Sequence, residues 1–290
     1  MPLILVPTPL GNLRDVTLRA LDVLRDAELI VAEDTRVARK LLQALGIAGR
    51  ELWSYREQNA ANVTAGIVER ARSGLVAVTC DAGMPGISDP GSDLVAAARA
   101  AGVAVEALPG PSAAFGVAAL SGFSLRRFTF EGFPARSSQA RRAGFAQALR
   151  ANVTTIWYES PRRIRATLAD LEAAAPGARV FLVREYTKRH EQQTFGSPAD
   201  VAAALPEPVR GEVAFAVAPY RVAALSVAET NAGDADAAID QLLAENRRVG
   251  EIAKVLARRG LGNRADLYAR ASARKAAGKG GAVSTESGRP

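Results

Sequence analysis

The sequence predicts an α/β protein built from two domains and a small helical appendage. Short apolar runs, such as residues 3–6, 29–32 and 76–79, are each followed by a polar or glycine-rich loop and then by apolar residues at helical spacing. The length of 290 residues is sufficient for two domains. A hydrophobic fraction of 48% and a charged fraction of 23% are typical of globular proteins.

The first predicted domain, residues 1–120, consists of repeated strand and helix units. Strands are expected at 3–6, 29–32, 76–79 and 103–108, and helices around 18–24, 41–45, 63–72, 94–101 and from residue 113 onward. Thr17 is expected to cap the first helix. Because parallel strands end at one edge of a sheet, we expect the polar loops after these strands to meet there.

The loop at residues 81–91 is the most unusual stretch of the chain. It contains three glycines and two prolines between a strand and a helix. The glycines let a ligand approach the main chain, and the prolines fix the loop before the ligand arrives. At the carboxyl edge of a parallel sheet this composition indicates a ligand site. The alternative is a long turn in which Asp81 and Asp89 only cap the next helix.

The second predicted domain covers residues 121–220. Strands are expected at 128–133, 154–158, 180–183 and 213–217, and polar clusters at 159–163 and 184–191 follow two of them. Residues 134–142 are predicted to be a basic loop that enters a helix. Such a segment suits phosphate binding, although a solvated helix face explains it equally well.

The composition changes again beyond residue 220. Three helices are expected at 235–245, 249–259 and 263–271, within an appendage spanning 221–272, and residues 273–290 are expected to be disordered. The outline weakly resembles a helix-turn-helix. The whole chain has a net charge of +7, of which residues 247–290 contribute +8 and the remaining residues −1. This asymmetry suggests a phosphate-rich partner.

Several classes of protein are disfavoured by the composition. One cysteine rules out an internal disulfide, and one histidine leaves too few ligands for a zinc site, so no metal is expected. No apolar run is long enough to cross a bilayer, and the first residues lack the basic lead of a signal peptide. We therefore expect a cytoplasmic protein without a membrane partner.

Six ordered motifs resemble the small-subunit ribosomal RNA methyltransferase I family. They lie at residues 6–15, 32–36, 81–91, 109–113, 158–163 and 184–188. The resemblance implies the tetrapyrrole-methylase fold, in which two αβα domains hold S-adenosylmethionine in the cleft between them. It further implies methylation of a cytidine ribose 2′-hydroxyl in the decoding region of 16S ribosomal RNA, and a homodimer.

The resemblance also implies which residues contact the cofactor. These are Leu10, Asp81, Ala82, Gly83, Met84, Pro85, Ser112 and Ala113 in the first domain, and Tyr158 and Glu159 in the second. Met84 stands where the family pattern has a threonine. No G-x-G-x-x-G follows the first strand, which counts against a dinucleotide-binding dehydrogenase.

Methylation of a ribose hydroxyl requires a group that orients the hydroxyl or accepts its proton. The candidates are Glu33, Asp34, Glu185 and Lys188, and we favour Lys188 with Glu185, because they follow a second-domain strand that is expected to face the cleft. A neighbouring arginine, Arg36 or Arg184, is expected to lower the pKa of the lysine. RNA phosphates are expected to contact Arg36, Arg136, Arg141, Arg142, Arg162 and Arg163.

Two other functions remain open at this point. The first is a methyltransferase of the same fold that acts on a tetrapyrrole or another small molecule, against which the basic appendage counts. The second is a non-enzymatic RNA-binding protein, for which the loop at 81–91 would have no purpose. The RNA substrate is expected to be either free 16S ribosomal RNA or the assembled small subunit.

Overall fold

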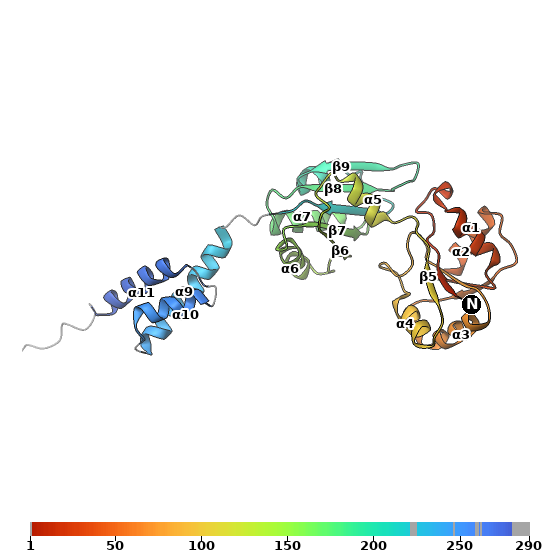
Figure 1. Ribbon diagram of the computed structural model, residues 1–290. Helices are drawn as coiled ribbons and strands as arrows, with labels where there is room; N and C mark the ends of the chain where they lie inside the picture. The colour runs from red at the N-terminus through yellow and green to blue at the C-terminus, as the bar shows by residue number, and fades with distance from the viewer. Residues whose placement is uncertain (1, 221–224, 246, 259–260, 262, 280–290) are drawn as a thin grey trace, which may run out of the picture. The chain divides into compact units, whose positions relative to one another are not determined.

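The computed structural model describes residues 2–220, 225–245, 247–258, 261 and 263–279. The chain divides into two compact units, Met1–Arg221 and Val222–Pro290, which are described separately (Figure 1). The first unit contains two five-stranded sheets, each covered by helices, so the predicted α/β class is confirmed.

The first sheet is entirely parallel. Its strands lie in the order β3 (Glu51–Ser54), β2 (Leu29–Ala32), β4 (Val76–Thr79), β1 (Leu3–Leu5) and β5 (Val105–Ala107). The edge strand β3 is absent from the sequence prediction. Its residues are exposed or half-buried, so it lacks the apolar run that marks its buried neighbours.

Helices cover both faces of this sheet because its strand residues alternate between the faces. Leu3, Val31 and Val78 pack with α3 (Ala60–Ser73) and α4 (Ser92–Ala100). Ile4, Ile30 and Ala77 pack with α1 (Leu18–Asp26) and α2 (Thr35–Ala44). A short 3-10 helix, η1 (Leu13–Asp15), precedes α1. The predicted cap is confirmed, since the Thr17 hydroxyl accepts a hydrogen bond from the Ala20 N–H at 3.1 Å.

The second sheet is mixed. Its order is β6 (Phe128–Gly132), β7 (Thr154–Glu159), β10 (Val213–Val217), β8 (Val180–Arg184) and β9 (Gln192–Gly196). Strands β6 and β7 are parallel, whereas β10 runs antiparallel to both of its neighbours. The edge strand β9, antiparallel to β8, was also missed from the sequence, because half-buried polar residues alternate along it with exposed ones.

Three helices cover one face of the second sheet and a single helix covers the other. α6 (Ser138–Leu149), α7 (Ile164–Ala174) and α8 (Pro198–Ala204) pack with Trp157 and Phe215. On the opposite face α5 (Ala113–Leu120) packs against small strand residues, including Ala214 and Ala216. Figure 1 draws α5 beside β7 and β8. By packing, α5 therefore belongs with the second sheet, although it lies within the first domain expected from the sequence, residues 1–120.

A buried ion pair corrects the prediction for the basic segment at 134–142. Helix α6 already begins at Ser138, so Arg141 and Arg142 are helical. The Arg141 Nε lies 2.8 Å from an Asp170 carboxylate oxygen, and only 6% of the Arg141 surface is exposed. Its guanidinium also donates to the carbonyls of Ala135 and Arg136. Arg141 is therefore a structural residue, because its charge is neutralised inside the fold.

The second unit is a group of three helices, α9 (Leu225–Ala244), α10 (Val249–Arg258) and α11 (Arg264–Lys279). Its core includes Ile239, Ile252 and Leu256. The predicted start of α9 was ten residues too late, and the disorder expected from residue 273 is wrong as far as residue 279. Arg274 of α11 is ion-paired with Asp236 and Asp240 of α9, which stabilises this extension. Residues 280–290 lie outside the described residues.

Among the helices that the structure describes, none is both long and apolar enough to cross a membrane.

Candidate functional site

A two-bond backbone bridge joins the loops that follow β1 and β4. The Thr8 N–H donates to the Gly83 carbonyl at 2.9 Å, and the Gly83 N–H donates to the Thr8 carbonyl at 3.0 Å. The Thr8 hydroxyl donates to the Cys80 carbonyl as well. Gly83 has φ +86°, a conformation that favours glycine. The unusual loop at 81–91 is therefore fixed against its neighbour at the carboxyl edge of the first sheet.

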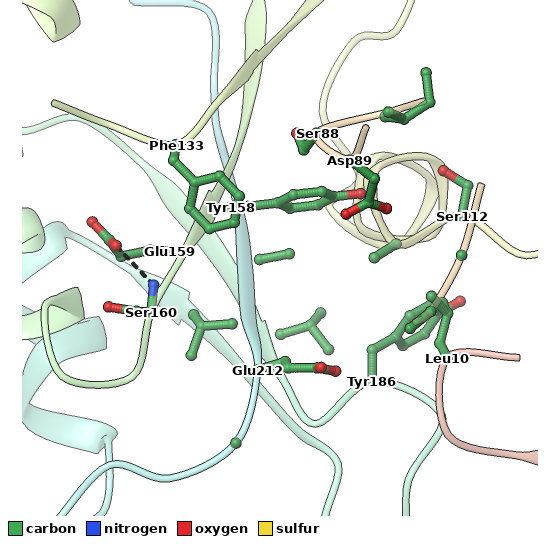
Figure 2. Close-up of a pocket in the computed structure, with 18 of the residues that line it drawn as sticks. Leu10, Ser88, Asp89, Ser112, Phe133, Tyr158, Glu159, Ser160, Tyr186 and Glu212 are labelled. Atoms are coloured by element: carbon green, nitrogen blue, oxygen red, sulfur yellow. Dashed lines mark hydrogen bonds between the residues drawn. The ribbon is translucent and has the colours of Figure 1, made fainter. Parts of the chain in front are cut away.

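A pocket of about 350 Å³ opens beside this bridge (Figure 2). Its walls come from both sheets of the first unit and are mostly apolar or aromatic, with a few polar groups. The lining residues are Leu10, Ala82, Gly83, Met84, Ile87, Ser88, Asp89, Ser112, Ala113, Phe133, Tyr158, Glu159, Ser160, Pro161, Val183, Tyr186, Gly211, Glu212, Val213 and Ala214. This size and lining are typical of a small-molecule site.

The structure brings most of the expected cofactor residues together in this pocket. Leu10, Ala82, Gly83, Met84, Ser112, Ala113, Tyr158 and Glu159 all line it. Asp81 does not, and lines a neighbouring groove instead, while Pro85 is buried outside the lining. These residues come from four segments that are far apart in sequence. Three segments follow the parallel strands β1, β4 and β5 at one edge of the first sheet, and the fourth is the end of β7 in the second sheet.

The second-sheet side of the pocket contains residues that sequence reasoning missed. Gly211 and Glu212 lie directly before β10, and Val213 and Ala214 begin it. Because β10 is antiparallel to β7, its amino end lies at the edge where β7 ends. Tyr186 also lines the pocket, and it lies within the motif at 184–188, although the resemblance does not place it at the cofactor. No sequence signal marks the start of a buried strand as part of a site.

The Tyr158 and Glu159 side chains are held firmly. The Tyr158 hydroxyl accepts a hydrogen bond from the Ala114 N–H at the start of α5, at 3.0 Å. Glu159 has a fully buried carboxylate that accepts from the Ser160 N–H at 2.7 Å and from the Thr167 hydroxyl at 2.6 Å. The Arg163 guanidinium lies 3.0 Å from the Glu159 carboxylate and neutralises its charge. Glu159 therefore shapes the pocket wall, and its negative charge is already compensated.

A larger polar groove of about 1020 Å³ adjoins the pocket. It is lined by Glu33, Asp34, Arg36, Ser54, Arg56, Glu57, Gln58, Asn59, Asp81, Ser88, Asp89 and Pro90. Ser88 and Asp89 line both cavities, so the pocket and the groove meet at these two residues.

Three carboxylates at this groove, those of Glu33, Asp81 and Asp89, have raised pKa values. Burial raises the pKa of Glu33, and the nearby charges of Asp89 and Asp81 raise it further. Burial likewise raises the pKa of Asp81 and of Asp89. Carboxyl groups with raised pKa values are suited to accept a proton near neutral pH.

Asp34, by contrast, has a structural role. Its carboxylate caps α2 through the Arg36 N–H at 2.8 Å and pairs with the Arg36 guanidinium at 2.6 Å. Hydrogen bonds from Arg36 hold the pKa of Asp34 far below its usual range. The carboxylate of Asp34 therefore stays ionised and occupied, which makes it a weaker proton acceptor than Glu33.

The pKa of Lys188, the favoured base, is raised and not lowered as expected. Its Nζ lies 3.0 Å from Glu185 and 2.8 Å from Glu212. Burial alone lowers the pKa of Lys188, but the hydrogen bonds to these two carboxylates outweigh burial and raise it. The expected lowering is therefore wrong. Neither Lys188 nor Glu185 lines the pocket or the groove.

The geometry gives Lys188 and Glu185 a clamping role. The turn that carries them has positive φ at Glu185 and at Thr187, and Glu185 accepts hydrogen bonds from Lys188 and from the Glu212 N–H. A Cβ at Gly11 would overlap the Lys188 stem, so that stem lies against the loop after β1. The clamp therefore ties the ends of β8 and β10 to the first sheet's loops.

The expected phosphate-binding arginines fall into two groups. Arg141 and Arg163 are structural, since Arg163 pairs with Glu159 and donates to the Pro134 carbonyl at 2.6 Å. The exposed group comprises Arg36, Arg136, Arg142 and Arg162. Arg36 and Arg142 also pair with carboxylates, but their side chains keep 79% and 54% of their surface exposed.

Comparison with known proteins agrees with these features. Residues 2–202 match the family model described as Tetrapyrrole (Corrin/Porphyrin) Methylases. The chain is 41% identical over 221 residues to the ribosomal RNA small subunit methyltransferase I of Neisseria meningitidis serogroup B, covering 75% of this chain and 76% of that protein. The chain belongs to the ribosomal RNA small subunit methyltransferase I family. This membership identifies a methyltransferase and disfavours a non-enzymatic RNA-binding protein.

Solved structures support the fold of this methyltransferase. A crystal structure of diphthine synthase matches with a TM-score of 0.59 at 16% identity, over 75% of this chain and 90% of that one. A uroporphyrin-III C-methyl transferase from Thermus thermophilus, complexed with S-adenyl homocysteine, matches with a TM-score of 0.53 at 17% identity, over 75% and 97% of the two chains. The tetrapyrrole-methylase fold expected from the sequence is confirmed.

The clamp predicts a stability effect for Lys188→Met. Removing the ammonium leaves Glu185 and Glu212 facing each other, so we expect the methyltransferase to lose about 2 kcal/mol of unfolding free energy at neutral pH. Both tryptophans, Trp53 and Trp157, lie in the first unit, so fluorescence during urea unfolding reports on this unit. Arg189→Met, at the exposed neighbouring position, is the matched control and should change stability little.

The difference in unfolding free energy between the wild-type chain and Lys188→Met should depend on pH. The fold lowers the pKa of Glu185 below 4.5, because the bonds from Lys188 and the Glu212 N–H outweigh the effect of burial, and it raises that of Lys188 above 10.5. The stabilisation is therefore complete between these values, declines as pH falls below 4.5 and declines as pH rises above 10.5. A difference that grew in acid would contradict the assigned clamp.

Proposed function

We propose that the chain transfers a methyl group from S-adenosylmethionine to the ribose 2′-hydroxyl of a cytidine in 16S ribosomal RNA. Family membership over three quarters of the chain carries this proposal, and the joined pocket and groove support it. The site of action would be the cytoplasm, on free ribosomal RNA or the assembled small subunit.

The pocket residues are suited to S-adenosylmethionine. When bound, this cofactor supplies a methyl group activated by a sulfonium. Leu10 and Met84 offer apolar contacts, and the rings of Tyr158 and Tyr186 offer flat surfaces. The Ser112 hydroxyl makes no capping hydrogen bond within α5, so it is available to a polar ligand group. The bonds that hold this loop, between the backbones of Thr8 and Gly83, do not involve the side chain at position 84.

The groove is suited to the RNA substrate. Its arginines, Arg36 and Arg56, both pair with Asp34 but keep 79% and 46% of their side-chain surface exposed, which leaves donors for phosphates. Gln58 and Asn59 provide donors and acceptors for a nucleotide. Enzymes that modify a single nucleotide commonly bind it splayed out of its helix. The exposed Arg136, Arg142 and Arg162 would extend the electrostatic contact along the RNA.

The exposed apolar face of α5 supports the homodimer that the family resemblance implies. Phe115 is 65% exposed, Leu120 is 41% exposed, and Phe195 of β9 is 52% exposed. Large exposed apolar side chains are a common feature of protein interfaces. Light scattering of the purified protein measures its mass, and a monomer at micromolar concentration would contradict the homodimer.

The substrate assignment is tested by mapping ribose methylation on 16S ribosomal RNA. Cells that lack this protein should lose one 2′-O-methylcytidine in the decoding region, and the purified protein with S-adenosylmethionine should restore it. Methylation of a tetrapyrrole by the purified protein, with an unchanged RNA map, would instead favour the small-molecule alternative.

Gly116→Ala should disturb the cofactor pocket without touching a charged group. A Cβ at Gly116 would overlap the Tyr186 ring and lie 2.7 Å from its hydroxyl oxygen, so the ring must shift within the pocket wall. We expect calorimetry to show about tenfold weaker binding of S-adenosylmethionine, on the order of 1.4 kcal/mol. Gly144→Ala in α6 is the matched control, because its Cβ would meet nothing within 4 Å. Equal affinities for the two variants would contradict the assigned pocket.

Removing residues 222–290 should weaken RNA binding in a salt-dependent manner. This unit carries exposed basic residues, including Arg248, Lys254, Arg258 and Arg264, and each phosphate contact contributes about 0.7 to the slope of log affinity against log salt for single strands. We expect a shallower slope for the shortened chain, with binding of S-adenosylmethionine preserved. An unchanged slope would exclude this unit from RNA binding.

A further inference from the structure

We infer that Asp89 is the group that accepts the proton of the attacking hydroxyl, at the point where the pocket and the groove meet. The inference rests on the proposed function, which places the methyl donor in the pocket and the RNA in the groove. Methyl transfer then requires the two ligands to meet where the cavities join. Ser88 and Asp89 are the residues that line both cavities, and Asp89 is the titratable one of the two.

The other acidic groups of the pocket are already neutralised. Glu159 is bound by Arg163, Thr167 and the Ser160 N–H, and Glu212 is paired with Lys188. Asp89 forms no ion pair among the described residues. The nearby buried thiol of Cys80 donates to the Ala82 and Gly83 carbonyls at 3.3 Å, and as a weak donor it leaves acceptor capacity on the Asp89 carboxylate.

The backbone holds Asp89 in place before a substrate arrives. Ser88 has φ +62° and Gly91 has φ +155°, and the intervening Pro90 restricts Asp89 to extended conformations. In Figure 2 the carboxylate points into the pocket beside the hydroxyl end of Tyr158. A fixed carboxylate at the junction can orient a hydroxyl at little entropic cost.

The electrostatic surroundings suit a proton acceptor. Burial raises the pKa of Asp89, and the charge of Asp81 raises it further, while the Cys80 thiol opposes this. The titratable groups facing it are Cys80, Asp81, Tyr158 and Glu33. A carboxylate with a raised pKa is more basic while still ionised at neutral pH.

The 2′-oxygen forms a bond to the methyl carbon as its O–H proton passes to the Asp89 carboxylate. The bond between that carbon and sulfur breaks, and its electron pair stays on sulfur, which becomes a neutral thioether. Asp89 then releases the proton to water in the open groove. The products are the 2′-O-methyl ribose, S-adenosylhomocysteine and one proton.

The test compares Asp89→Asn with the wild-type chain in single-turnover methylation of 16S ribosomal RNA between pH 5 and pH 9. The amide keeps the shape of the side chain but accepts no proton, so we expect the rate to fall at least about 100-fold. The wild-type rate should rise with pH through the pKa of Asp89, and this acidic limb should vanish in Asp89→Asn. Asp89→Glu should retain the limb, and Asp93→Asn, at an exposed position in the first turn of α4, should behave as wild type.

Binding measurements separate this role from a structural one. Calorimetry with S-adenosylmethionine and filter binding with the RNA should give affinities for Asp89→Asn within about fivefold of wild type. A rate within threefold of wild type, or a rate loss matched by lost binding or by a lower urea midpoint, would overturn the assignment to Asp89. A wild-type chain that transfers no methyl group to the RNA would instead contradict the proposed function.

Discussion

The backbone bridge between Thr8 and Gly83 is the constraint on which the site depends. Two hydrogen bonds hold the loop at 81–91 against the loop after β1, and the Thr8 hydroxyl secures the preceding Cys80 carbonyl. Backbone bonds of this kind are insensitive to side-chain identity, so the loop can keep its path while its side chains change. Met84 lies next to Gly83 in this loop, and neither hydrogen bond of the bridge involves its side chain.

The charged groups around the site divide into those that build it and those that remain available to ligands. Arg141, Arg163 and Lys188 each neutralise a buried or half-buried carboxylate, and removing one partner of such a pair leaves an uncompensated charge. These residues therefore serve the architecture, even though their sequence context suggested phosphate binding or catalysis. Of the groups that remain available, Glu33, Asp81 and Asp89 line the groove, and Arg136, Arg142 and Arg162 are exposed outside it, where solvent lowers the cost of holding a charge.

The sequence predicted the buried parts of this fold well and its edges poorly. Strands at 29–32, 76–79 and 213–217 have the predicted bounds, because continuous apolar runs mark strands buried on both faces. Strands β3 and β9 lie at sheet edges and lack that signal. The pocket loops were recognisable from their glycines and prolines, but strand direction is not encoded locally, so the residues before β10 were missed. The pKa of Lys188 was misjudged because Glu212, 24 residues away in the chain, determines it together with Glu185.

The order of strands in the second sheet bears on how the protein is made. Strand β10 is the last strand of this sheet in the chain, yet it lies between β7 and β8 with all five residues buried. During synthesis, both neighbours emerge from the ribosome with an unpaired edge facing the place that β10 will fill. Open edges of this kind are prone to pair with other chains. The nascent polypeptide is thus vulnerable to aggregation until residue 217 has emerged, and its dependence on chaperones should be concentrated in that interval.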